Sequence, residues 1–256
     1  MDNKAIRLEA RRLLAGKWEK LALVWLILYA IDNVLYSLIS WTLILILIIF
    51  LIITGPFNYM YLILLILSSI VVTIIPIIIA GPFTLGINAI FLKIWRKEDF
   101  KIEEMFNGFK YFGRALGTYL LRYIYIFLWS ILLIVPGIIA AISYSMTFFI
   151  LAENPNIKAA DALRLSKQMM YGHKTQYFML ILSFIGWFLL SILTFGIGLL
   201  FLYSYITMAS TIFYQQIKGE ALYNEIIIEN VEQSTKSPTE DSDKSTNQDS
   251  PYQDLY

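Results

Sequence analysis

Three long stretches of the chain contain almost no charged residue, and they decide what it can fold into. They cover residues 21–92, 115–152 and 175–217. A helix needs about 20 apolar residues to cross the hydrocarbon core of a bilayer, so each stretch is too long for one crossing. With 58% hydrophobic and only 15% charged residues, the composition excludes an ordinary soluble domain. The sequence therefore predicts an integral membrane protein with several helical spans.

Glycine and proline divide these stretches. Val135-Pro136-Gly137 interrupts the second and Phe195-Gly196-Ile197-Gly198 the third, while Gly55-Pro56 and Gly81-Pro82 interrupt the first. We predict an all-α, polytopic membrane helix bundle of about six transmembrane helices, paired as three hairpins. The predicted spans are residues 21–39, 59–80, 117–135, 137–152, 177–195 and 199–217. Residues 41–53 are too few to span comfortably and form either a helical extension or a re-entrant piece.

The basic residues indicate the orientation of these spans. Every lysine and arginine except Arg122 lies in the N-terminal arm, in residues 93–114, in residues 158–174 or from Lys218 onward. Basic residues favour the cytoplasmic side. If the chain crosses the membrane an even number of times between one basic segment and the next, all the basic segments lie on the cytoplasmic side. Three hairpins, each of two crossings, meet this condition. Both termini are expected to be cytoplasmic.

An amphipathic segment precedes each hairpin, at residues 4–15, 101–113 and 157–171. Apolar residues recur at helical spacing in each segment, with basic residues between them. This pattern is typical of a helix lying on the inner membrane surface. A cytosolic helix packed on its neighbours has the same pattern, and both interpretations remain open.

Two of the hairpins resemble each other in sequence. Ser130-Ile131-Leu132, Gly137 and Ser143-Tyr144 align without gaps with Ser191-Ile192-Leu193, Gly198 and Ser204-Tyr205. The segments preceding the first and third hairpins also match, since Arg11, Leu13, Leu14 and Gly16 correspond to Lys167, Met169, Met170 and Gly172. These matches indicate an internal repeat of three units, each a helix followed by a hairpin.

Three motifs together resemble a known family. They are Glu9-Ala10-Arg11-Arg12-Leu13-Leu14-Ala15-Gly16-Lys17-Trp18, the Val135-Pro136-Gly137-Ile138-Ile139 turn, and Leu165-Ser166-Lys167-Gln168-Met169-Met170-Tyr171-Gly172-His173-Lys174. The chain resembles the bacterial membrane family called domain of unknown function 975 over roughly residues 6–218. The resemblance implies a multi-spanning protein of the bacterial cytoplasmic membrane and supplies no activity and no catalytic residues. Residues 41–59 do not match the pattern.

Two ionisable residues lie inside the predicted spans. Asp32, beside Asn33, is about 16 Å into the first span at 1.5 Å per residue, near the middle of the membrane. The pair is either a proton or cation site or the outer cap of a helix that begins near Trp18. Arg122 is only about 8 Å deep, so its side chain can reach the inner headgroups.

Other polar residues lie in the second halves of the hairpins, among them Tyr144 and Tyr205, with Asn88 in the first unit. Interhelical hydrogen bonds, at about 0.6 kcal/mol each, explain most of them. A polar cavity shared by the hairpins is the alternative, and its candidate residues are Asp32, Asn33, Asn88, Tyr144 and Tyr205. The candidate contacts to lipid headgroups are Arg7, Arg11, Arg122, Lys167 and Lys174.

The sequence offers little chemistry. It contains no cysteine and one histidine, His173, which cannot form a zinc site without other ligands. Phosphate-binding, zinc-protease and hydrolase motifs are absent. We expect no catalytic residue, no metal and no cofactor, and therefore no enzymatic activity. Residues 1–228 form the predicted membrane domain, and residues 229–256 a disordered, acidic cytoplasmic tail.

Two functions follow as hypotheses. The first is a non-enzymatic multi-pass protein of the bacterial cytoplasmic membrane that organises lipids or membrane partners. The second is a small-solute transporter or channel with a polar cavity between the repeated hairpins. The expected partners are membrane lipids, with a membrane protein or a second copy of the chain as further candidates, and no nucleic acid.

Overall fold

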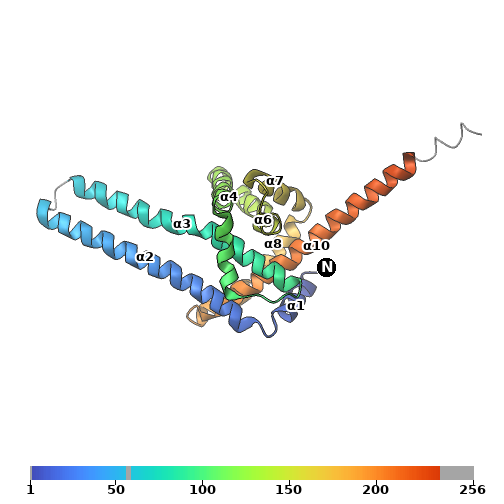
Figure 1. Ribbon diagram of the computed structural model, residues 1–256, viewed down its shortest axis with the longest axis horizontal. Helices are drawn as coiled ribbons and strands as arrows, with labels where there is room; N and C mark the ends of the chain where they lie inside the picture. Colours follow the sequence, from blue (N-terminus) through green and yellow to red (C-terminus); the bar gives the residue numbers. More distant parts are fainter. Residues whose placement is uncertain (1, 56–58, 237–256) are drawn as a thin grey trace, which may run out of the picture.

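A computed structural model describes residues 2–55 and 59–236, which contain helices and no strand. Helices α2 (Trp18–Thr54) and α3 (Tyr59–Trp95), of 37 residues each, form an antiparallel hairpin that extends from a bundle of the other helices (Figure 1). The other elements are α1 (Asn3–Leu14), the 3₁₀ helix η1 (Ile102–Tyr111), α4 (Phe112–Leu132), α5 (Ile134–Ser143), α6 (Thr147–Glu153), α7 (Ala159–Met169), α8 (Lys174–Leu182), α9 (Ile185–Leu193) and α10 (Ile197–Lys236).

Helix α2 corrects one interpretation of the sequence. It continues without a break through Asp32 and Asn33, so these residues do not cap the outer end of a helix. The side-chain amide of Asn33 donates to the carbonyl of Tyr29, 2.8 Å away in the same helix. Residues 41–53 are therefore a helical extension of α2. At 1.5 Å per residue the helix is about 56 Å long, which exceeds the thickness of a hydrocarbon core of about 30 Å.

Within the described ranges, six helical segments are long and apolar enough to cross a membrane. They are Trp18–Ile53, Ile63–Trp95, Ile102–Leu132, Ile134–Glu153, Lys174–Leu193 and Ile197–Glu220. Two of them contain a break that the sequence analysis did not predict, at residues 144–146 and 183–184. A serine lies at each break, where Ser145 and Ser183 donate to the carbonyls of Ile142 and Leu180.

Helix α10 ends at Lys236, within residues 229–256, which were expected to form a disordered tail. The remaining part of the predicted tail, residues 237–256, lies outside the described residues.

The short hairpins are buried at one end and exposed at the other. In α10, Met208 and Phe213 are fully buried, whereas Phe195 in the turn before this helix is 99% exposed and Ile197 is 64% exposed. The second hairpin shows the same gradient, from Leu151, which is buried, to Ile134, which is 77% exposed. The buried ends belong to the protein's own core, and the turn ends are the more exposed apolar ends.

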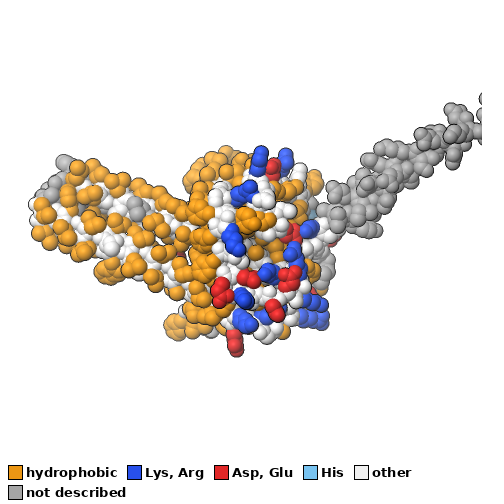
Figure 2. Space-filling view, in the orientation of Figure 1, with side chains coloured by type: hydrophobic (Ala, Val, Ile, Leu, Met, Phe, Trp, Pro, Cys, Tyr) orange, Lys and Arg blue, Asp and Glu red, His pale blue; other side chains and the backbone are white. Residues whose placement is uncertain are grey.

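Charge follows the same division. Lysine, arginine, aspartate and glutamate gather on the end of the molecule away from the tip of the α2–α3 hairpin, and hydrophobic side chains cover the hairpin itself (Figure 2). Helix α10 crosses the base of the hairpin in contact with both α2 and α3 (Figure 1). The molecule is therefore apolar at one end and highly charged at the other.

Glycine allows α3 and η1 to pack backbone against backbone. A Cβ atom on Gly86 would lie 2.0 Å from the carbonyl oxygen of Met105, and one on Gly108 would lie 1.9 Å from that of Pro82. No side chain can be accommodated at such distances, so these two glycines fix η1 directly against α3.

Helices α1 and α7 end in the same way, at positions that align in sequence. Gly16 and Gly172 both have positive φ angles, of 73° and 81°, which glycine adopts at little cost. The aligned Leu14 and Met170 are both fully buried. Each helix packs mainly on a hairpin other than the one that follows it, α1 on α10 and α7 on α4 and α6. Each also makes smaller contacts with the hairpin that follows it, α1 with α3 and α7 with α10.

The two aligned hairpins also share internal contacts. A Cβ atom on Gly137 would lie 2.9 Å from the Cα of Ser130, and one on Gly198 would lie 2.9 Å from the Cα of Ser191. Both serines donate to the carbonyl four residues earlier, over 2.8 Å in each case. The same small residues therefore bring the two arms of each hairpin together.

Candidate functional site

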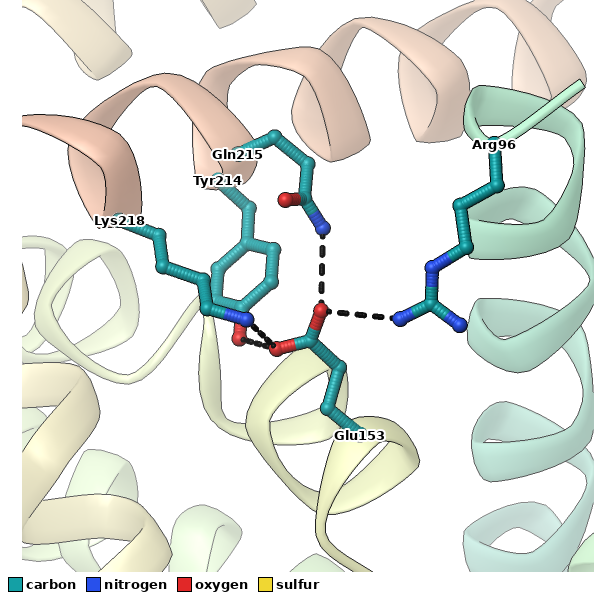
Figure 3. Close-up of polar contacts among 5 residues, drawn as sticks. All are labelled: Arg96, Glu153, Tyr214, Gln215 and Lys218. Carbon is teal, nitrogen blue, oxygen red and sulfur yellow. Dashed lines mark hydrogen bonds and ion pairs between the residues drawn. The ribbon is translucent and has the colours of Figure 1, made fainter.

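The most concentrated polar cluster joins three helix segments at the charged end of the molecule. Its centre is Glu153, the last residue of α6, whose side chain is only 8% exposed. Figure 3 shows Arg96 reaching it from beyond the end of α3, with Tyr214, Gln215 and Lys218 on α10. The Arg96 guanidinium lies 3.3 Å away, the Tyr214 hydroxyl donates over 2.7 Å and the Gln215 amide over 3.2 Å. Lys218 forms the second ion pair.

These contacts use both oxygens of the carboxylate. Arg96 and Gln215 contact Oε1, whereas Tyr214 and Lys218 contact Oε2. A nearly buried carboxylate with four donors is well compensated and leaves no oxygen free to act as a base. The cluster therefore ties α3, α6 and α10 together. Sequence analysis missed Glu153, although a single acid between the apolar run ending at Ala152 and the Asn154-Pro155 turn was a visible signal.

A second site surrounds Arg11, one of the residues expected to contact lipid headgroups. Its Nε donates to the hydroxyl of Tyr205 over 3.0 Å, and that hydroxyl donates in turn to the carbonyl of Arg7 over 3.2 Å. The guanidinium carbon lies 5.3 Å from the ring centroid of Trp187 and 5.4 Å from that of Tyr205. Cation–π contacts with two rings hold the cation in place while the side chain stays exposed.

A pocket of about 330 Å³ opens beside this arginine. Helix α9 contributes Trp187 and Leu190 to its walls, α10 contributes Phe201, and Trp18 at the start of α2 closes one side. Arg11 is the only residue with a formal charge among those that line it. The pocket is therefore an apolar recess with one cation at its edge.

The other expected headgroup residues lie apart from this pocket. Lys167 is exposed on α7. Lys174, at the start of α8, lines a shallower apolar recess with Val135 and Phe178. Arg7 contributes its backbone carbonyl to the Arg11 site.

Arg122 lies against Phe148, with its guanidinium carbon 6.0 Å from the ring centroid. Its Nε is buried and has no hydrogen-bond partner within the described part of the chain. Tyr119, Tyr123 and Tyr177 are close enough to interact with it electrostatically. The guanidinium is thus surrounded mainly by aromatic side chains.

The residues proposed for a shared polar cavity lie in different surroundings. Asp32 lines a groove of about 610 Å³ between α2 and the start of α10, whereas Tyr205 lines the Arg11 pocket. Asn88 is buried and donates to the carbonyl of Thr84 in its own helix, over 2.7 Å. Tyr144 is buried, with its ring centroid 5.9 Å from that of Tyr125.

This architecture can be compared with known proteins. A family model described as "Protein of unknown function (DUF975)" matches residues 1–143 and 131–221. The chain belongs to the DUF975 family. The two DUF975 matches overlap over residues 131–143, which include helix α5. Comparison with curated proteins and with solved structures found no match. The DUF975 description assigns no activity, so a functional proposal must rest on the geometry of this chain.

Proposed function

We propose that this DUF975 protein is a non-enzymatic multi-pass protein of the bacterial cytoplasmic membrane that binds and orders anionic lipids around its charged end. Both termini then lie on the cytoplasmic side. The observation that carries the proposal is the division of the molecule into an apolar end and a charged end (Figure 2). Arg11 is held beside an apolar pocket by its contacts with Trp187 and Tyr205.

Electrostatics supports the choice of anionic lipids. Without residues 229–256, which hold two lysines and seven acids, the chain has a net charge of +6, since the whole chain carries +1 and that segment −5. Each lysine or arginine near an anionic membrane surface is worth about 1 kcal/mol of attraction. Basic residues of α1 and α7 lie on exposed faces, and the buried faces of these helices hold them to the bundle.

The equivalent construction of two units also supports this role. Helices α1 and α7 carry the aligned basic residues Arg11 and Lys167, each exposed on a helix that packs against a hairpin. Two units that each present a cation beside an apolar hairpin are suited to contact several lipids. A single catalytic centre would not require the same arrangement twice.

Spin-labelled lipids test the proposal on the full-length protein reconstituted into vesicles. Electron spin resonance measures the fraction of lipid that the protein immobilises. We expect spin-labelled phosphatidylglycerol to be immobilised more strongly than spin-labelled phosphatidylcholine, with the difference shrinking as salt rises. Equal immobilisation of the two lipids at low salt would contradict the proposal that the protein binds anionic lipids.

A small-solute transporter is the second candidate, and the position of Asp32 in the groove between α2 and α10 favours it. An acid at membrane depth is expensive and often serves transport. If this function is correct, Asp32→Asn should reduce solute uptake or ion conductance in reconstituted vesicles, and unchanged flux would reject it. The matched control is Glu19→Gln, at an exposed acid in the first turn of the same helix that does not line the groove.

A further inference from the structure

The guanidinium of Arg11 has unused hydrogen-bonding capacity. Within the described residues its hydrogen bonds involve Nε alone, which donates to Tyr205. The two terminal nitrogens carry four more N–H groups, and the side chain is exposed. The hydroxyl of Tyr205 is already engaged with Arg7, so the local network is complete without them. A fixed guanidinium with free terminal nitrogens is suited to bind an oxyanion in two-pronged fashion.

The pocket below Arg11 opens toward apolar surroundings. Its walls include Trp187, Leu190 and Phe201, which are 43%, 52% and 41% exposed. Apolar side chains this exposed on a membrane protein face hydrocarbon, not water. A ligand that combines an oxyanion with a hydrocarbon chain would therefore match the arginine and the walls at the same time.

The distance along α10 from Tyr205 to the turn of the third hairpin is close to the thickness of one leaflet of the hydrocarbon core. Tyr205 is about 12 Å along α10 from Ile197, where the helix begins, at 1.5 Å per residue. Half of a hydrocarbon core of about 30 Å is about 15 Å. A phosphate at Arg11 would therefore let an acyl chain follow the pocket to the hairpin end near the bilayer centre. In this arrangement the third hairpin enters one leaflet and does not make the two crossings that the sequence predicts.

We propose that the recess between α1, α9 and α10 is a binding site for one anionic phospholipid of the inner leaflet. The phosphate contacts the terminal nitrogens of Arg11, and one acyl chain lies against Trp187, Leu190 and Phe201. The inference rests on the proposed function and deepens it, because it replaces a general attraction to anionic lipids with one defined site.

Native mass spectrometry of the full-length protein in detergent tests the site. Phosphatidylglycerol is titrated, with phosphatidylcholine and inorganic phosphate as separate competitors. We expect one tightly bound phosphatidylglycerol, which neither competitor displaces at equal concentration. Arg11→Gln should weaken this binding about tenfold, the equivalent of one hydrogen bond to a charged group. Arg12→Gln is the matched control, because Arg12 is the exposed neighbour on α1 and does not line the pocket.

A further variant separates lipid binding from local structure. Arg11→Gln also removes the hydrogen bond to Tyr205, and Tyr205→Phe removes that same bond while keeping the guanidinium. Tyr205→Phe should therefore weaken phosphatidylglycerol binding less than Arg11→Gln does, because the guanidinium and its contacts with the two rings remain. A loss in Tyr205→Phe equal to or greater than the loss in Arg11→Gln would overturn the proposal.

The remaining outcomes are equally distinct. Displacement of the lipid by equimolar inorganic phosphate would show a simple anion site and refute the role of the acyl chain. If Arg11→Gln binds as the unchanged protein does, while spin-labelled phosphatidylglycerol is still preferentially immobilised, this site is wrong and the proposed function stands. If that preference is absent as well, both are wrong.

Discussion

The guanidinium of Arg96 lies 3.3 Å from the carboxylate of Glu153, although 57 positions separate the two residues in the chain. Lys218 contacts the same carboxylate from α10. This single acid thus links the end of the first long hairpin to the last helix. Its surroundings are more consistent with a structural junction than with a catalytic group, because every contact is a donor from the protein itself.

Removing the carboxylate should weaken the bundle. Glu153→Ala leaves two cations and a nearly buried tyrosine hydroxyl without their acceptor, so we expect a loss of about 2–3 kcal/mol. This is below the full cost of breaking a buried pair, because the side chains of Arg96 and Lys218 are about half exposed. Thermal unfolding in detergent measures the effect. Glu98→Ala, at an exposed acid beyond the same end of α3, should leave the melting temperature nearly unchanged. Equal melting temperatures for the two variants would contradict the junction.

The contact between α3 and η1 should not tolerate a methyl group. Gly86→Ala would place its Cβ 2.0 Å from a backbone oxygen of Met105. Because backbone cannot rotate away as a side chain can, we expect destabilisation of about 3 kcal/mol or more, measured by the loss of helical circular dichroism on heating.

Gly117→Ala provides the control for this contact, because a Cβ at Gly117 in α4 meets nothing within 4 Å. Alanine should be neutral there or stabilise the helix by up to about 1 kcal/mol. A Gly86→Ala protein as stable as the Gly117→Ala protein would show that α3 and η1 do not pack this closely.

The aligned hairpins should respond alike to the same substitution. Gly137→Ala and Gly198→Ala each bring a Cβ to 2.9 Å from the Cα of the facing serine, so each should cost about 1–3 kcal/mol. Urea titration in detergent compares the two proteins. Gly186→Ala, in the same hairpin as Gly198 but with open space around its Cβ, is the reference. A large cost at one hairpin and none at the other would argue against equivalent units.

The depth of the third hairpin can be measured directly, since the chain has no cysteine of its own. If Arg11 lies at the inner headgroups, the turn at Phe195 lies near the bilayer centre. Phe195→Cys should then resist a membrane-impermeant maleimide applied from either side of the vesicle. Lys20→Cys, on the exposed charged side, should react from the cytoplasmic side only. Labelling of Phe195→Cys from the outer side would show that the hairpin crosses the whole bilayer.

Much of the architecture could be predicted from local patterns. Phe195-Gly196 lies between α9 and α10, and Val135-Pro136-Gly137 lies in the first turn of α5, just after α4 ends at Leu132, where a helix tolerates proline. Gly81-Pro82 was expected to interrupt the first stretch, but α3 continues through it to Trp95. The helical breaks at residues 144–146 and 183–184 were not predicted. A serine bonds back to its own helix at each break, but Ser68 and Ser69 do the same inside the unbroken α3, so this hydrogen bond alone does not predict a break.

The extension of α2 through Asp32 shows a second limit. The sequence alone left residues 41–53 as either an extension or a re-entrant piece, because both have the same composition. The antiparallel partner α3 is equally long, and the two pair along their length (Figure 1). The pairing of two helices of equal length is a feature of the tertiary structure, and the composition of residues 41–53 does not reveal it.

The sequence by itself determined that this is an all-helical chain with six apolar segments of membrane length and basic residues gathered between them, because hydropathy and charge are local quantities. Membership of the DUF975 family follows from the same linear pattern. Only the tertiary structure decided which charges meet. It brought Glu153 to Arg96 and Lys218, and Arg11 to Trp187 and Tyr205, across separations of 57 to 194 positions. Such pairings depend on how α1 and α10 pack against the hairpins, and side-chain packing at a distance leaves no periodic signal in the sequence.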